Sequence, residues 1–237
     1  MNKKLIYLIV SFLIVIVVIS TFIKFTYGEE KTDSIIFKQE YESYNKDLIS
    51  LKIRKNNNIK YSSYDEIIDI IQNGTGVIYL GTPTSNWCRN IINPLFDATN
   101  NNDIETIYYL DISKDMDYYI VEDDKLVYRI DDNGKEQKGT EEYFKLVDLL
   151  KDYLSPYTIE LDDKKYTTDS YRIYLPTVIF VKDGEIVGFH VSTVISHINE
   201  DKKLTDDEYE ELYDIYEGYI LDMSSDTCSI DKNGSGC

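Results

Sequence analysis

The chain has 237 residues, of which 43% are hydrophobic and 13% aromatic, so it can bury a sizeable core and wholesale disorder is excluded. It holds 43 acidic and 25 basic side chains, for a net charge of −18, and the first 28 residues contain three lysines and no acid, so residues 29–237 carry −21. A surface this negative repels nucleic acid and anionic lipid headgroups, which argues against both as partners, and three cysteines are too few for a disulfide-built scaffold.

The amino terminus predicts a membrane anchor. Residues 5–23 are apolar apart from two serines and one threonine, and this run is about long enough to cross the hydrocarbon core of a bilayer. Lys3 and Lys4 favour a cytoplasmic amino terminus, which places the acidic body outside. The segment 25–28 is a poor cleavage site, so we favour a signal anchor, and a cleaved signal peptide remains the alternative.

The sequence therefore predicts a single-pass protein of the cell membrane whose domain lies on the extracytoplasmic side, where disulfides persist. Its predicted parts are a cytoplasmic tip and transmembrane signal anchor (1–28), a tether (29–36), a folded domain (37–225) and a cysteine-containing tail (226–237).

Helix and strand signals alternate along the body. The first half predicts a short helix at 37–48, an irregular strand or hairpin at 53–61, a helix opened by a capping box at 63–66 and stopped at 73–74, a buried strand at 77–80, a helix at 88–98 with Pro94 inside it, and a strand at 104–112. The second half predicts Asp-rich turns over 113–135 with a hairpin turn at 132–134, a helix from Thr140 to about 154 that Ser155-Pro156 ends, a hairpin of strands 177–181 and 185–190, and a last helix opened by a capping box at 205–208. This order predicts one α/β domain.

Two motifs carry a family resemblance. Gly74 to Asn90 reads GTGVIYLGTPTSNWCRN, a buried strand followed by a loop that opens a helix, and Tyr174 to Gly188 reads YLPTVIFVKDGEIVG, a proline that begins a strand of a hairpin. Together they resemble the thioredoxin-like fold, in which a C-x-x-C motif follows the first central strand and faces a cis-proline loop. They are most similar to a bacterial extracytoplasmic group often labelled bacteriocin transport accessory protein. The resemblance covers roughly residues 38–225 and implies a thioredoxin-like fold with an insertion at 113–160.

The resemblance implies a site at these two motifs. Its catalytic positions are Ser85, Cys88 and Pro176, with Ser85 where the family has its nucleophilic cysteine and Cys88 as the resolving cysteine. Polypeptide-binding positions are Asn86, Trp87, Leu175 and Thr177. An alternative register makes Cys88 the nucleophile and requires a longer loop before the motif.

Serine at position 85 changes the expected chemistry. A thiol at a helix amino terminus can have a pKa as low as about 3.5–7.5, whereas a hydroxyl there stays un-ionised. Oxygen also cannot form the mixed disulfide through which thiol exchange proceeds. Cys88 is then either a buried small hydrophobe or a slow, partner-activated single thiol.

Cys228 and Cys237 enclose a polar loop, and their spacing permits a disulfide that an oxidising compartment favours. Such a bridge pins the carboxyl terminus, or alternatively serves Cys88 as a dithiol relay. His190 and His197 have no metal-ligand spacing with other residues, so structural or surface roles are expected, and neither a metal site nor a cofactor is predicted.

Three functions follow as hypotheses. The first is an anchored thioredoxin-like protein with a degenerate S-x-x-C site that acts as a binding or accessory module for exported or secreted polypeptides. The second is a thiol-disulfide oxidoreductase that uses Cys88. A redox-inert structural domain of a secretion assembly is a third.

Overall fold

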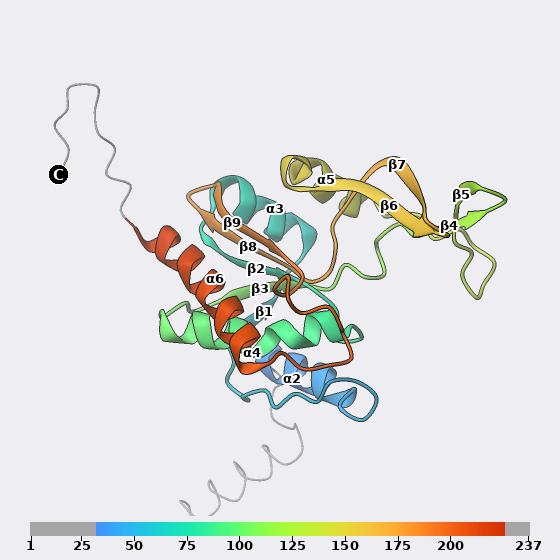
Figure 1. The fold of residues 1–237 in the computed structure, drawn as a ribbon. Coiled ribbons are helices and arrows are strands. Elements are labelled where there is room, and N and C mark those ends of the chain that lie inside the picture. The colour runs from blue at the N-terminus through green and yellow to red at the C-terminus, as the bar shows by residue number, and fades with distance from the viewer. Residues whose placement is uncertain (1–31, 226–237) are drawn as a thin grey trace, which may run out of the picture.

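A five-stranded mixed sheet forms the centre of the molecule in a computed structural model that describes residues 32–225 (Figure 1). The strand order is β1-β3-β2-β8-β9, with β1, β2 and β3 parallel to one another and β8 antiparallel to both β2 and β9. The strands are β1 (Ile59–Tyr61), β2 (Gly76–Leu80), β3 (Ile107–Leu110), β8 (Thr177–Lys182) and β9 (Glu185–Val191). The predicted α/β architecture is confirmed.

Helices cover both faces of this sheet. The helices are α2 (Asp33–Ser43), α3 (Tyr64–Asn73), α4 (Asn86–Asn101), α5 (Glu141–Leu149) and α6 (Asp206–Ser224). Successive residues of β2 point to opposite faces. Val77 and Tyr79 join a core cluster with α2, α4 and α6, whereas Ile78 and Leu80 join a second cluster with α3 and α5. The continuous apolar run predicted as a buried strand is therefore apolar because both of its faces are covered.

Local capping signals place three helix starts correctly. The side-chain oxygens of Ser63, Thr140 and Thr205 each accept a hydrogen bond from a backbone N–H three residues ahead. At Thr205 the reciprocal bond from the backbone to Glu208 is also present, so the predicted capping box is complete. At Ser63 only the forward bond forms.

A pair of hairpins extends from the sheet, to the right in Figure 1, and is called the arm here. It consists of β4 (Tyr119–Glu122), β5 (Lys125–Tyr128), β6 (Ser155–Leu161) and β7 (Lys164–Arg172). The sequence pattern does not predict the β6–β7 hairpin, because its strands carry few apolar side chains and Ser155-Pro156 indicates only the end of a helix. The predicted turn at 132–134 is present, but it joins no named strands and is closed by the isolated bridge between Ile130 and Glu136.

Several predicted boundaries move. Helix α2 begins at Asp33, so its first turn occupies positions assigned to the tether, and it ends at Ser43. Helix α4 begins two residues before the predicted start and runs through Pro94 to Asn101. The predicted strands at 53–61 and 104–112 shrink to β1 and β3. The predicted anchor (1–28) and the cysteines of the tail lie outside the described residues. Within residues 32–225, no helix combines the length and the apolar character needed to cross a bilayer.

Candidate functional site

The two motifs singled out in the sequence meet at one end of the sheet. In the register of β2 with β8, Leu80 pairs with Thr177. The loop that leaves β2 therefore starts beside Pro176, which precedes β8 and follows a cis peptide bond from Leu175. The backbone N–H of Ser192, just after β9, donates to the Pro176 carbonyl at 2.8 Å, so the chain after β9 borders the same place.

Ser85 is the N-cap of α4. Its side chain accepts a hydrogen bond from the backbone N–H of Cys88 at 3.4 Å, which satisfies one of the free donors at the start of the helix. Asn86, the first helical residue, accepts from the Ile49 N–H at 2.9 Å and donates to Asp201 at 3.2 Å. Asn86 therefore joins the helix start to two distant loops.

Cys88 lies one turn inside α4 and has no exposed surface. Its sulfur accepts a hydrogen bond from the Thr82 N–H at 3.4 Å. Burial raises the pKa of the Cys88 thiol to about 11, although the Thr82 N–H and the side chains of Ser85 and Tyr79 act in the opposite direction. The desolvation of the thiolate outweighs these hydrogen bonds, so the thiol is protonated at neutral pH.

Neutral tyrosines lie behind this thiol. Tyr79 donates to the Cys88 carbonyl at 3.4 Å, and its hydroxyl lies 2.8 Å from the hydroxyl of Tyr41. Burial raises the pKa of both tyrosines well above its usual value. Asp111 acts on Cys88 only by raising its pKa further. The hydrogen bond that the sulfur receives, from the Thr82 N–H, comes from a donor and not from a base.

Arg89 is completely buried next to Cys88 and fixes the segment before β1 to the loop between β2 and α4. Its guanidinium donates to the carbonyls of Ile49, Tyr41 and Pro83 at 2.7, 2.6 and 3.1 Å, and to Asn45 at 2.7 Å. All four acceptors are neutral. Sequence reasoning missed this residue, because its acceptors are main-chain and side-chain oxygens from residues 41–49 and from Pro83, which are far from Arg89 or point to it only in the folded chain.

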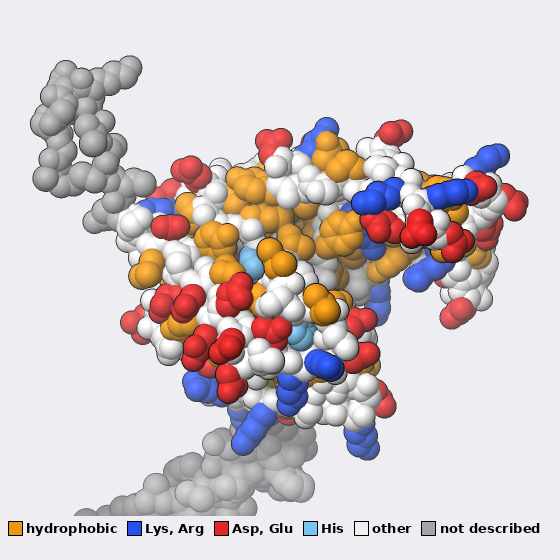
Figure 2. All heavy atoms as spheres, in the orientation of Figure 1, with side chains coloured by type: hydrophobic (Ala, Val, Ile, Leu, Met, Phe, Trp, Pro, Cys, Tyr) orange, Lys and Arg blue, Asp and Glu red, His pale blue; other side chains and the backbone are white. Residues whose placement is uncertain are grey.

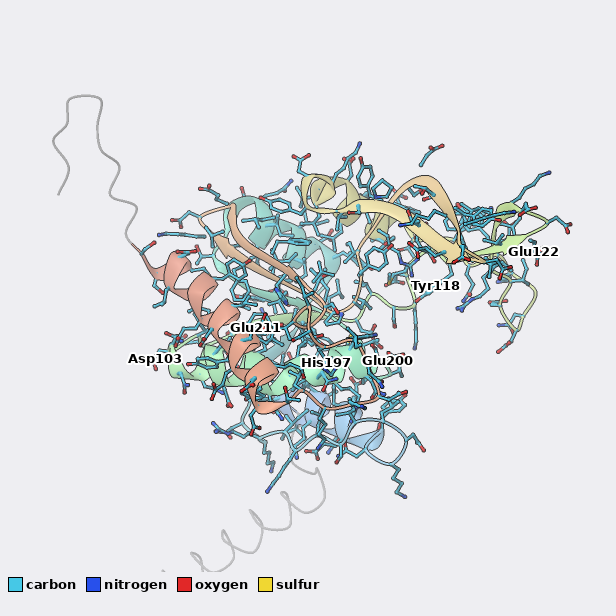
Figure 3. All side chains as sticks on the ribbon, viewed as in Figure 1. Asp103, Tyr118, Glu122, His197, Glu200 and Glu211 are labelled. Atoms are coloured by element: carbon cyan, nitrogen blue, oxygen red, sulfur yellow. The ribbon has the colours of Figure 1, made fainter. Side chains whose placement is uncertain are left out.

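Trp87 packs against His197, with ring centroids 5.5 Å apart in an edge-to-face arrangement. His197 is buried between α4 and α6, where its Nε2 lies 3.1 Å from Asn90 Nδ2 and its Nδ1 lies 3.3 Å from a Glu208 oxygen (Figure 3). It fills the structural role expected from the sequence. His190 lies elsewhere, half-buried against Tyr216, and burial lowers its pKa. The described part of the chain contains no cluster of His, Cys, Asp and Glu able to hold a metal ion.

Two isoleucines beside this histidine were not expected. Ile195 is 97% exposed and Ile198 is 87% exposed, and the next most exposed large hydrophobic side chain among residues 32–225 is Leu221 at 55%. Both lie in the loop between β9 and α6, which has no periodic pattern, so no helix or strand rule assigns an inward or outward direction to them.

The structure thus brings Ser85, Asn86, Trp87 and Cys88 to the end of the sheet where β8 begins at Thr177, directly after Leu175 and Pro176. Of these side chains, Ser85, Trp87 and Leu175 are partly exposed, whereas Cys88 and Thr177 are completely buried. No protein-family model matches the chain, and neither the comparison with curated proteins nor the one with solved structures gives a match.

Proposed function

We propose that this chain is a thioredoxin-like protein, anchored in the cell membrane with its domain outside, that binds exported or secreted polypeptides without dithiol chemistry. The place of the anchor rests on the sequence alone. The fold proposal is supported by the strand order β1-β3-β2-β8-β9, by the helix that follows β2, and by the cis-proline directly before β8. The arm and α5 then form an insertion between β3 and β8.

The proposed lack of redox activity rests on one observation. The residue at the accessible start of α4 is a serine whose oxygen caps the helix, and the sulfur one turn further in is buried with a pKa of about 11. This geometry favours the register in which Ser85 takes the nucleophile position. Thiol exchange requires an accessible thiolate, and neither position supplies one.

Binding is the activity that remains at such a site. Trp87, in the first turn of α4, and Leu175, just before β8, are partly exposed. Tyr174 is exposed next to Leu175. Aromatic side chains of this kind are favoured at polypeptide contacts. The peptide group between Leu175 and Pro176 lies at the same end of the sheet as the start of α4.

Reduction of insulin by dithiothreitol, followed by turbidity, tests the proposal with the full-length chain. The wild-type chain and Cys88→Ser should both leave the rate at its background value. Ser85→Cys should accelerate it, because this variant restores the accessible thiol on an intact scaffold. Turnover by the wild-type chain that Cys88→Ser abolishes would establish the oxidoreductase alternative instead.

A further inference from the structure

The loop between β9 and α6 presents an apolar surface next to the site. The isoleucine patch, defined here as Ile195 and Ile198, flanks His197 and contains the two most exposed large hydrophobic side chains of the described chain. Single exposed hydrophobic side chains are common, but two neighbouring isoleucines that stand almost entirely in water beside a candidate site are typical of a contact surface.

This loop is held in place rather than loosely attached. His197, between the two isoleucines, contacts Trp87 and Asn90 of α4 and Glu208 of α6, and Val194 is buried in the core. These contacts keep both isoleucine side chains directed outward. A partner that covers them therefore does not have to order the loop first, which lowers the entropic cost of binding.

The charge around the patch indicates what kind of partner fits. Residues 192–225 hold ten acidic side chains and two lysines. Figure 2 shows acidic side chains gathered over α6, next to a band of hydrophobic side chains. Glu200 is two residues from Ile198 and is exposed, as is Glu211 on α6 (Figure 3). When a partner buries the isoleucines, its residues on either side of that contact lie next to these carboxylates. Positive charge on those residues is therefore favoured.

We infer that the isoleucine patch and the acidic face of α6 together bind basic, amphipathic polypeptide segments. This inference rests on the proposed function and narrows its substrate class. The apolar side of the segment covers Ile195 and Ile198, while its lysines or arginines lie against the exposed carboxylates of the loop and of α6. Anionic membranes are repelled by the same carboxylates.

The experiment measures binding of fluorescent peptides by anisotropy to the full-length chain in phosphatidylcholine nanodiscs, with empty nanodiscs as background. Four peptides of equal length are compared: a Lys/Leu amphipathic helix, a Glu/Leu helix of the same pattern, a Lys/Ser peptide without an apolar side, and a neutral apolar peptide. The Lys/Leu peptide should bind at least about ten-fold more tightly than the other three, and added salt should weaken its binding.

Variants locate the surface. The double variant Ile195→Ser, Ile198→Ser should weaken binding of the Lys/Leu peptide by about ten-fold or more, since burial of even one isoleucine is worth about that factor. Ile130→Ser is the matched control, because Ile130 is a 54% exposed isoleucine two residues after β5, and this variant should bind the Lys/Leu peptide as the wild-type chain does. Glu200→Gln with Glu211→Gln should weaken binding, whereas Glu122→Gln on the arm should not (Figure 3).

The results distinguish failure of this inference from failure of the proposed function. Equal affinity for the Lys/Leu and Glu/Leu peptides, or wild-type affinity of the isoleucine double variant, overturns the inference. If only the neutral peptide binds, the basic specificity is wrong while polypeptide binding stands. If no peptide binds and the chain reduces insulin, the proposed function itself fails.

Discussion

Cys88 should react slowly with alkylating agents, at a rate that follows from its surroundings. Burial raises its pKa to about 11. At about pH 7, roughly one such side chain in 10,000 is a thiolate, against about 3 in 100 for an unperturbed thiol of pKa about 8.5. The thiolate of higher pKa is intrinsically more nucleophilic, with a Brønsted slope of about 0.4–0.5, which restores a factor of about ten. Ionisation alone therefore slows the reaction about 30-fold, and the complete burial of the side chain slows it further.

The assay is iodoacetamide labelling followed by mass spectrometry in the Cys228→Ser, Cys237→Ser background, where Cys88 is the remaining thiol. The same protein unfolded in concentrated urea is the reference, because its thiol is exposed and has an ordinary pKa. The folded protein should react at least about 30-fold more slowly at neutral pH, and its rate should still rise above about pH 9. A folded rate within about three-fold of the unfolded one, or a plateau below about pH 8, would refute the reasoning.

Three stability measurements test the packing around the site and the sheet. Arg89→Met should lower the free energy of unfolding in urea by about 3–5 kcal/mol, because it leaves buried acceptors without a donor, and a loss below about 1 kcal/mol would contradict that role. The pKa of Cys88 is higher in the folded chain than in the unfolded one, so the folded state keeps the proton and stability should fall as pH rises from about 8.5 towards 11, by at most about 1.4 kcal/mol per unit. Cys88→Ala should lose that part of the slope, and an identical pH profile in both proteins would argue against it. Gly184→Ala should cost more than about 2 kcal/mol, because φ is +79° and an added Cβ would lie 2.4 Å from the Gln72 carbonyl oxygen. Its counterpart Gly218→Ala, on the exposed face of α6 with open space around the added Cβ, should stabilise by about 0.5–1 kcal/mol, and equal effects of the two changes would show that neither geometry matters.

Local signals in the sequence were sufficient for the central part of the fold. The run Val77–Leu80, the turn before Glu185 and the capping residues Ser63 and Thr205 each act on neighbours within a few positions, so the pattern and its structural consequence lie in one short window. The start of β8 at Thr177, directly after Pro176, was predictable for the same reason, because a proline is tolerated where no ladder donor is needed.

The parts that sequence reasoning missed depend on contacts between distant segments. Arg89 looks like a surface cation in the sequence, and only the approach of the end of α2, the loop after it and the loop between β2 and α4 supplies the oxygens that allow it to be buried. The direction of Ile195 and Ile198 is set by His197, whose partners lie on two helices separated by more than a hundred residues. The strands of the arm pack chiefly against one another. Their sequences therefore show only a weak alternation of apolar and polar side chains.

The serine at the start of α4 has a structural role of its own. The N-cap position requires an acceptor for a free backbone N–H, and serine is among the residues that satisfy it best, with a contribution of about 1 kcal/mol. The hydroxyl oxygen of Ser85 therefore meets the structural requirement of this position, and Cys88, the one cysteine among residues 32–225, is buried. A buried, protonated thiol beside Tyr79 is compatible with a stable core, because no charged group has to be desolvated there.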